Sequence, residues 1–405
     1  MNVILGGGDV GKTTILDAIG LLLNPTNATA ISDTEYYLRK EDTGFSIEAI
    51  MALPSGVPIN QQTKAAWPWS WNGTDAAVPD TEGEGTANQS PVYKFRVRGT
   101  EDLELVYEIV QPDGTGDILP VGIRRAVGLV RLGGDDRNDR DLRLVHGSAL
   151  DRLLSDKGLR SRLTTALAKS NVRDELSSEA NALLEALDGS FKAKSLPNGL
   201  DLAVTGSQGL AIAALIGLTA KRGEVALPLS SWGSGTRRLA ALAIAEENQG
   251  VAPIMLVDEA ERGLEPYRQH VLMKKLQEGA SQVFVTTHSP SAIAAASAAN
   301  FWYVDHKGAI GPLDARKIAR HRNGDAETFL ARLSIVNEGV TEVGFVGVLL
   351  ARAGLEPLEQ KGIHLADGGG NETTLDLLEA LAAGGLKFGG FADDEKGQHA
   401  GGGGR

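Results

Sequence analysis

The chain has 405 residues, of which 42 % are hydrophobic, a formal net charge of −12 and no cysteine. This length favours two or three domains with ordinary buried cores, and the lack of cysteine excludes disulfides and thiolate metal sites. No run of about 18 or more uncharged apolar residues occurs, so we expect no membrane span. The N-terminus lacks the basic and apolar regions of a secretory signal, so we expect a cytoplasmic protein.

The first predicted elements are a strand over residues 1–5 and a helix over residues 13–23, which Asn24-Pro25 ends. Between them, the segment GGGDVGKT matches the pattern G-x-x-x-x-G-K-[ST] in full, after a strand and at the start of a helix. Such glycines let backbone N–H groups surround phosphates, and the helix N-terminus favours their charge. The pattern predicts an ATP site in which Lys12 reaches the β- and γ-phosphates and Thr13 supplies a hydroxyl to Mg²⁺. The predicted nucleotide-binding residues here are Gly6, Gly7, Gly8, Asp9, Val10, Gly11, Lys12, Thr13 and Thr14.

The middle of the chain changes pattern twice. Alternating runs at residues 46–50, 93–97 and 103–110 predict strands, and the polar segment 54–90 between the first two predicts an insertion or long loop. Residues of about 140–200 contain a charged, helical pattern that predicts a helical insertion, after which helices and strands alternate to the end.

The most basic stretch is residues 121–173, with ten Arg and two Lys against six Asp, an excess of +6. It is either a solvated helical surface with internal ion pairs or a face that meets DNA phosphates. The arginines that would make the phosphate contacts are Arg124, Arg125, Arg137, Arg140 and Arg143.

A second part of the ATP site is predicted at residues 254–259, an apolar strand that ends in two carboxylates. Asp258 would hold Mg²⁺ through its water shell, and Glu259 would orient and polarise the attacking water. A further buried strand, residues 283–287, ends at His288, which we predict to contact the γ-phosphate. The alternatives are a structural acidic turn and a satisfied structural histidine.

The segment SSWGSGTRRL at residues 230–239 resembles the signature loop of ABC-type ATPases, and Gly263-Leu264-Glu265-Pro266 resembles their D-loop region. The resemblance implies that Ser234 and Gly235 contact ATP held on another subunit, and hence a homodimer built on the ATPase domain. A plain glycine helix start is the alternative.

After residue 332 the pattern is βαβαβ, with strands at 334–336, 362–366 and 388–392 and helices at 341–353 and 373–383. Acidic residues follow the strands, where α/β folds place their sites. Glu338 and Glu342 could converge with Asp393 and Glu395 on Mg²⁺, or on Mn²⁺ in its place, and two such ions can promote phosphodiester cleavage. Chance acidic clusters on solvated turns are the alternative.

The segments Glu338-Gly339-Val340-Thr341-Glu342 and Asp393-Asp394-Glu395 resemble the Toprim fold. An ABC-like ATPase followed by Toprim resembles the OLD (overcoming lysogenization defect) family of ATP-dependent endonucleases. The resemblance implies an α/β chain with an ABC-type P-loop ATPase domain at 1–332 and a partial Toprim domain at 333–405. The ATPase domain is expected to contain a helical insertion for dimerisation at about 140–200. The resemblance also implies Mg²⁺-dependent cleavage of DNA with Glu338 as a catalytic residue, whereas Glu259 and His288 are the predicted catalytic residues of ATP hydrolysis. Family members have strands before the P-loop and a catalytic lysine after the last motif, so we expect a chain shortened at both ends.

A different class fits the ATPase motifs as well: an SMC- or RecF-like ATPase that holds DNA or a partner protein without cutting. ATPases of these kinds act in phage defence or DNA repair. A transporter ATPase is disfavoured, because such a subunit has no need of an acidic C-terminal module.

Overall fold

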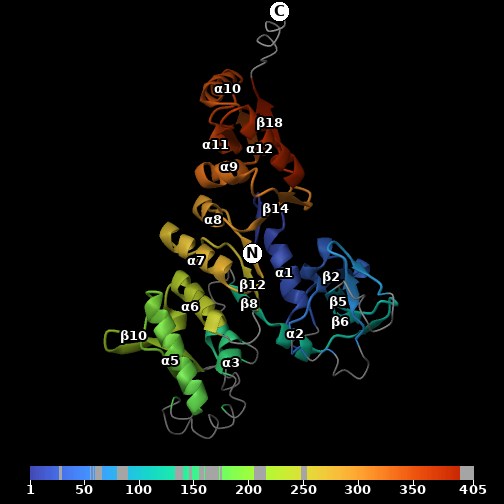
Figure 1. Cartoon of the computed structure of the whole chain (residues 1–405), viewed down its shortest axis with the longest axis vertical. Helices are drawn as coiled ribbons and strands as arrows, with labels where there is room; N and C mark the ends of the chain where they lie inside the picture. The colour runs from blue at the N-terminus through green and yellow to red at the C-terminus, as the bar shows by residue number, and fades with distance from the viewer. Residues whose placement is uncertain are drawn as a thin grey trace, which may run out of the picture. The chain divides into compact units, whose positions relative to one another are not determined.

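The computed structural model describes residues 1–26, 30–54, 56–57, 59, 66–79, 90–132, 140–145, 148–154, 159, 173, 176–204, 216–247 and 253–392. The chain forms α/β structure and divides into two compact units, each built from separate parts of the sequence (Figure 1). The first unit comprises Met1–Thr14, Val257–Gly279 and Val283–Arg405, and the second comprises Ile15–Leu256 and Ala280–Gln282. Strand β16 (Leu333–Asn337) follows the predicted domain boundary after residue 332, which stays a prediction.

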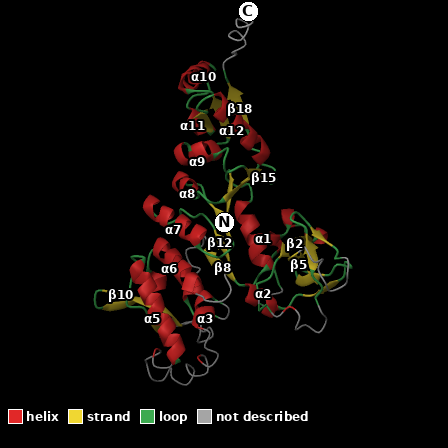
Figure 2. Ribbon diagram, viewed as in Figure 1, coloured by secondary structure: helices red, strands yellow, loops and turns green. Residues whose placement is uncertain are grey.

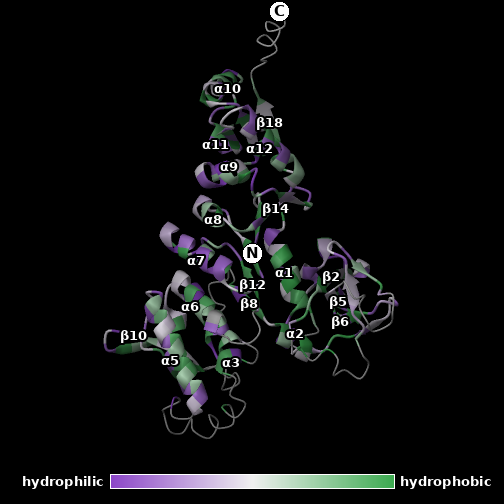
Figure 3. Ribbon diagram, viewed as in Figure 1, coloured by the Kyte–Doolittle hydropathy of each residue, from purple (hydrophilic) through white to green (hydrophobic). Residues whose placement is uncertain are grey.

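Four strands of the first unit follow one another in the order β15-β14-β1-β13 (Ile310–Leu313, Asn300–Val304, Asn2–Gly6 and Val283–Thr286). β1 is parallel to both β13 and β14, and β15 is antiparallel to β14. Val3, Leu5, Val283 and Val285 are fully buried, as expected for apolar strands covered on both faces. Helix α1 (Lys12–Leu22) begins soon after β1, and much of it is hydrophobic (Figure 3). From Ile15 onward α1 belongs to the second unit, and the helices of the first unit here are α7 (Pro266–Glu278), α8 (Pro290–Ala295) and α9 (Ala319–Gly324).

The C-terminal module has three parallel strands in the order β17-β16-β18, with β17 at Ile363–Asp367 and β18 at Phe388–Phe391. Helices α10 (Val340–Arg352), α11 (Leu358–Lys361) and α12 (Asn371–Gly384) connect the strands (Figure 2). The predicted βαβαβ pattern is confirmed, with every boundary within two residues, and only the short α11 was not predicted. Asn337 pairs with both Asp367 and Phe391, so the carboxyl ends of all three strands lie at one edge of the sheet.

Two glycines let the C-terminal module pack on the strands of the first unit. A Cβ on Gly311 of β15 would lie 2.4 Å from the carbonyl oxygen of Ala383 in α12. A Cβ on Gly384 would lie 2.7 Å from Leu313 Cδ2. Larger residues would therefore separate α12 from β15.

The second unit contains an antiparallel sheet in the order β4-β3-β5-β6-β7, in which β7 is Gly116–Ile118 and β2 also pairs with β5. The predicted strands are confirmed as β2 (Phe45–Met51), β5 (Ser90–Gly99) and β6 (Leu105–Val110). The prediction of a long loop over residues 54–90 was wrong in part, because β3 (Trp69–Trp71) and β4 (Ala76–Ala77) lie there. Trp69 donates its indole N–H to the Val110 carbonyl at 2.8 Å, and the Lys94 ammonium lies 4.3 Å from its ring centroid. These contacts with distant residues hold β3 in the sheet, although the polar, turn-rich sequence around it does not predict a strand.

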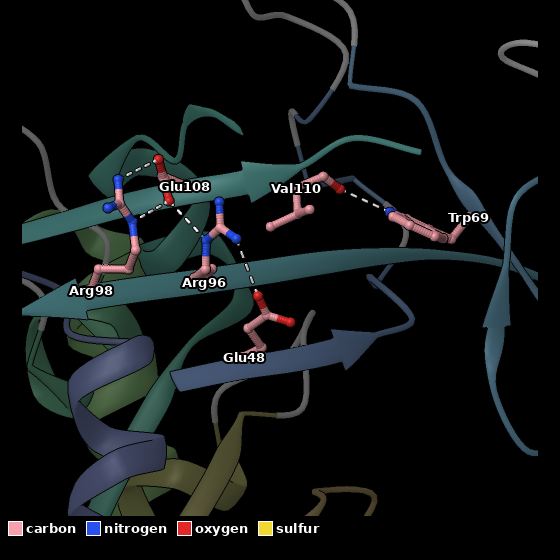
Figure 4. A network of polar contacts seen from close by, with 6 residues as sticks. All are labelled: Glu48, Trp69, Arg96, Arg98, Glu108 and Val110. Atoms are coloured by element: carbon pink, nitrogen blue, oxygen red, sulfur yellow. Dashed lines mark hydrogen bonds and ion pairs between the residues drawn. The ribbon is translucent and has the colours of Figure 1, made fainter. Parts of the chain in front are cut away.

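Charged side chains run across the same sheet (Figure 4). Arg96 faces Glu48 on β2 and Glu108 on β6, and its N···O distances to them are 3.3 and 2.8 Å. Arg98 also binds Glu108, at 2.9 Å, and this hydrogen bond is the largest cause of the lowered pKa of Glu108. The arginines are therefore matched by carboxylates, which favours a solvated sheet face over an unbalanced basic patch.

The rest of the second unit includes α2 (Val121–Val127), β8 (Leu129–Leu132), α3 (Ala149–Leu154), α5 (Ser178–Ala193) and α6 (Ser234–Glu247). The predicted helical insertion at about 140–200 contains helices α3 and α5. Most residues of 155–175 lie outside the described part. An antiparallel sheet of β9 (Asp201–Val204), β10 (Ile216–Arg222) and β11 (Val225–Pro228) follows. Strand β12 (Ile254–Val257) leads into Asp258.

The basic stretch contributes to the fold. The Arg124 side chain is 4 % exposed, donates to the carbonyls of Asn24 and Thr26, and lies 3.6 Å from the Tyr107 ring centroid. Arg125 donates to the Pro25 carbonyl at 2.7 Å. The phosphate-binding interpretation is therefore wrong for the buried Arg124, which instead satisfies backbone carbonyls just beyond the end of α1. Arg137 lies outside the described residues.

An ion pair in the first unit makes its stability depend on pH. The His364 Nε2 atom on β17 lies 2.8 Å from Asp325 Oδ1, and this hydrogen bond is the largest cause of the raised pKa of His364. Burial alone would raise the pKa of Asp325, but the hydrogen bond and charge of His364 lower it overall. The pair's contribution is thus lost as pH rises through the raised pKa of His364 or falls through the lowered pKa of Asp325.

We expect His364→Asn to lower the free energy of unfolding by about 1–3 kcal/mol between about pH 4 and 6.5, where both partners are charged. The loss should shrink above about pH 8, because the wild-type imidazole is then neutral. Denaturant unfolding at several pH values measures the difference, with His306→Asn in an exposed turn as the control. A loss that is equal at all pH values would contradict the ion pair.

Candidate functional site

The loop between β1 and α1 has a backbone that only glycine adopts readily at both ends. Gly6 has φ +154°, and a Cβ there would lie 2.8 Å from the Val304 carbonyl oxygen. Gly11 has φ +97° immediately before the first helical residue, Lys12. The free N–H groups of the first turn of α1 therefore open directly onto the loop, as an anion site requires.

Lys12 is turned toward this loop. Its side chain is 7 % exposed, and Nζ donates to the carbonyl oxygens of Gly6 and Gly7 at 3.2 and 2.5 Å. Burial is the largest influence on the pKa of Lys12 and lowers it, whereas the charge of Asp258 acts in the opposite direction. The ammonium is thus held beside the backbone that would surround the phosphates.

Asp258 is 6 % exposed and lies between two threonine hydroxyls. Thr286 Oγ1 at the end of β13 donates to Asp258 Oδ1 at 2.6 Å, and Thr13 Oγ1 donates to the same oxygen at 3.2 Å. A hydroxyl and a carboxylate this close form an oxygen donor set that suits Mg²⁺, which binds few protein ligands and keeps its waters. The predicted metal residues Thr13 and Asp258 are therefore together in the structure.

Glu259 has an unusual backbone, with φ +49°. Non-glycine residues in this region are strained by about 1–3 kcal/mol and persist where their surroundings fix them. Here the Glu259 N–H donates to Thr286 Oγ1 at 2.8 Å, and the next N–H, of Ala260, donates to the Thr286 carbonyl at 2.9 Å. The carboxylate of Glu259 is half-exposed and lies 3.6 Å from Arg262. It is thus accessible to water, as a group that polarises a water must be.

His288 follows β13 by two residues and is exposed to solvent. Despite this exposure, partial desolvation lowers its pKa, and the positive charge of Lys12 lowers it further. The neutral imidazole can donate one hydrogen bond to a phosphate oxygen. The backbone N–H of His288 donates to Glu261 Oε1 at 2.9 Å.

The segment that resembles a signature loop opens α6 in the second unit. Ser234 is the first residue of that helix, and Gly235 is buried in its first turn. Their predicted contact with ATP on another subunit is untested by a single chain and stays a prediction.

The C-terminal module places Glu338 directly after β16. Its N–H donates to the Phe391 carbonyl at the end of β18, and its carbonyl accepts from Gly370 N at 2.8 Å. The Glu342 carboxylate turns back toward this strand end. It lies so close to Gly339 that a Cβ added there would be 3.1 Å from Glu342 Oε2. Asp393 and Glu395 lie outside the described residues. Within residues 253–392 and the other described parts, no group of three or more His, Asp or Glu residues is placed to hold a metal ion.

Asp367, the last residue of β17, lies at the same edge of the sheet. Its carboxylate accepts from Gly369 N at 2.9 Å and pairs with Arg320 at 3.3 Å, and its carbonyl lies 2.9 Å from His321 Nε2. These contacts shape the glycine loop that follows, so Asp367 has a structural role there.

A family model matches part of the chain. Residues 111–294 match the family model described as "AAA domain, putative AbiEii toxin, Type IV TA system". This stretch contains Asp258, Glu259 and His288, whereas the P-loop precedes it. A search among curated proteins found no match. No helix among the described residues is long and apolar enough to cross a membrane.

Three solved structures show distant similarity. An SMC head bound to the C-winged helix domain of ScpA is 17 % identical, with 79 % of this chain and 91 % of that chain covered and a TM-score of 0.42. The SMC head domain from Thermotoga maritima is 13 % identical, with 77 % and 90 % covered and a TM-score of 0.34. The recombination mediator protein RecF with ATPrS is 14 % identical, with 76 % and 90 % covered and a TM-score of 0.41. No OLD protein or Toprim domain is among these matches, so that resemblance stays a prediction.

Two residues of the site were not predicted from the sequence. Thr286 holds Asp258 and the Glu259 backbone, and Glu261 holds the backbone of His288. A threonine at a strand end and a third acidic residue after the strand are the only signals that the sequence offers. Neither is specific, because both residue types are common in turns.

We expect Thr286→Val to weaken Mg²⁺-dependent ATP binding and to lower the free energy of unfolding by about 1–3 kcal/mol, because it leaves a buried carboxylate oxygen and a backbone N–H without this partner. Thr286→Ser keeps the hydroxyl and should retain most of the binding. Titration with a fluorescent ATP analogue, with and without Mg²⁺, measures the effect. Equal affinity in both variants would show that the hydroxyl does not matter.

Proposed function

We propose that the chain binds and hydrolyses ATP with Mg²⁺ and uses this cycle to control cleavage of DNA by its C-terminal module. The ATPase part is supported by the AAA domain match and by the position of Asp258 between the Thr13 and Thr286 hydroxyls. Lys12 binds the β- and γ-phosphates, and Thr13 and Asp258 hold Mg²⁺, which neutralises phosphate charge. Glu259 polarises the attacking water and His288 donates to the γ-phosphate.

The dimer is part of this proposal. Ser234 and Gly235 would complete the site on a second copy of the chain, with backbone N–H groups at the start of the 14-residue helix α6 directed at its ATP. A homodimer would then form only with nucleotide present, or become tighter with it.

The observation that carries the nuclease proposal is the position of Glu338. It follows the central strand β16, whose neighbours β17 and β18 lie on opposite sides. In open parallel sheets, this point of reversed strand order is where ligands bind. Glu342 turns back toward Gly339, and Asp393 comes two residues after the end of β18 in the sequence. The carboxylates of Glu338, Glu342, Asp393 and Glu395 are oxygen ligands of the kind that Mg²⁺ or Mn²⁺ prefers. Such ions stabilise the attacking and leaving oxygens of a phosphodiester displacement.

We expect the purified chain to nick supercoiled plasmid with Mg²⁺ or Mn²⁺, and Glu338→Ala to abolish nicking by at least about 100-fold while ATP turnover is unchanged. Gel separation of nicked and closed circles and phosphate release measure the two activities. The control is Glu359→Ala, which removes an exposed carboxylate from α11 of the same module.

ATP hydrolysis without nicking in the wild-type chain would contradict the nuclease proposal and favour the alternative, an SMC- or RecF-like ATPase that holds DNA or a partner protein. Nicking that survives in Glu338→Ala would assign the activity to a contaminant or another site.

A further inference from the structure

Glu261 is engaged at both carboxylate oxygens by the residues that lead into His288. Oε2 accepts from Thr287 Oγ1 at 2.6 Å, and Oε1 accepts from the backbone N–H of His288 at 2.9 Å. The Thr287 side chain is fully buried, whereas the His288 side chain is exposed. One carboxylate therefore fixes the backbone where the chain passes from the sheet to the solvent-facing histidine.

The residue after His288 is fixed from the same segment. Ser289 Oγ donates to Gln269 Oε1 at 2.6 Å, and the buried Gln269 donates to the Leu264 carbonyl at 2.8 Å. Ser289 N also donates to Thr287 Oγ1 at 3.0 Å. The side chains on both sides of His288, and its own backbone N–H, are thus bound to Glu261 and Gln269, in the segment that follows Asp258 and Glu259.

We infer that Glu261 is a positioning residue for ATP hydrolysis, which holds His288 in the orientation that meets the γ-phosphate and ties it to the segment after the acidic pair. The inference rests on the proposed role of His288 in ATP turnover. Water can satisfy an exposed loop N–H at little cost. The Glu261 carboxylate is therefore not needed to satisfy the His288 N–H, and what it contributes is a fixed orientation of the loop. Each oxygen of Glu261 accepts one hydrogen bond from this loop, so the carboxylate is itself held in one orientation.

Substitutions at position 261 can remove its two hydrogen bonds to different degrees. Gln keeps an acceptor for His288 N, and its amide can donate to Thr287 Oγ1 if that hydroxyl turns. Ala removes both contacts and leaves the buried Thr287 hydroxyl without this acceptor. A positioning role therefore predicts that Glu261→Gln retains most of the activity that Glu261→Ala loses.

The experiment compares ATP turnover in Glu261→Ala, Glu261→Gln, His288→Ala and the double variant Glu261→Ala/His288→Ala. We expect Glu261→Ala to lower kcat by about 10- to 100-fold, as misplacement of a reacting group does, with KM changed less than about threefold. In the His288→Ala background the same change should cost less than about twofold, because the residue that Glu261 positions is gone. Glu278→Ala, which removes an exposed carboxylate paired with Lys274 on α7, is the control for charge loss and should match the wild type.

Equal losses from Glu261→Ala in both backgrounds would overturn the inference, because Glu261 would then act independently of His288. A wild-type kcat in Glu261→Ala would overturn it as well. If His288→Ala turns over ATP normally, the proposed role of His288 fails first, and Glu261 has nothing catalytic to position.

Hydrogen exchange tests the same contact without turnover. With a slowly hydrolysed ATP analogue, the amides of residues 287–289 should become protected in the wild type and in Glu261→Gln, and should exchange faster in Glu261→Ala. Identical protection in Glu261→Ala would show that the carboxylate does not hold this loop, whether or not the chain hydrolyses ATP.

Discussion

The ATP site depends on one buried hydroxyl, that of Thr286. It donates to the carboxylate of Asp258 and accepts from the backbone N–H of Glu259, so a single atom fixes two residues of the proposed ATP site. Because Glu259 has φ +49°, its backbone would relax toward commoner conformations without such a contact. The strand β13 thereby determines where the acidic residues after β12 lie.

Three carboxylates follow β12 within four residues, and their surroundings give them different roles. Asp258 is buried between hydroxyls and suits a metal ion, whereas Glu259 is half-exposed and suits a water molecule. Glu261 accepts two hydrogen bonds from the loop that carries His288 and suits orientation. Burial and hydrogen bonding separate the roles of groups with the same chemistry.

In the C-terminal module, too, neighbouring strands fix the position of an acidic residue at a strand end. Its central strand β16 has neighbours on both sides, so the chain after Glu338 meets the ends of both β17 and β18. Gly311 and Gly384 bring this module close to the strands beside the ATP site, within one compact unit.

The P-loop, the acidic strand end and the βαβαβ pattern of the C-terminal module could be predicted from the sequence, because each depends on residue types within one turn, strand or helix. The hydrogen bonds of Thr286, Glu261 and Arg124, and the presence of strand β3, could be found only in the folded chain. Thr286 and Asp258 are 28 residues apart, Thr287 and Glu261 are 26 apart, and Arg124 and Thr26 are 98 apart. No local periodicity marks such partners, since a side chain's hydrogen bonds and burial are fixed only when distant segments pack together.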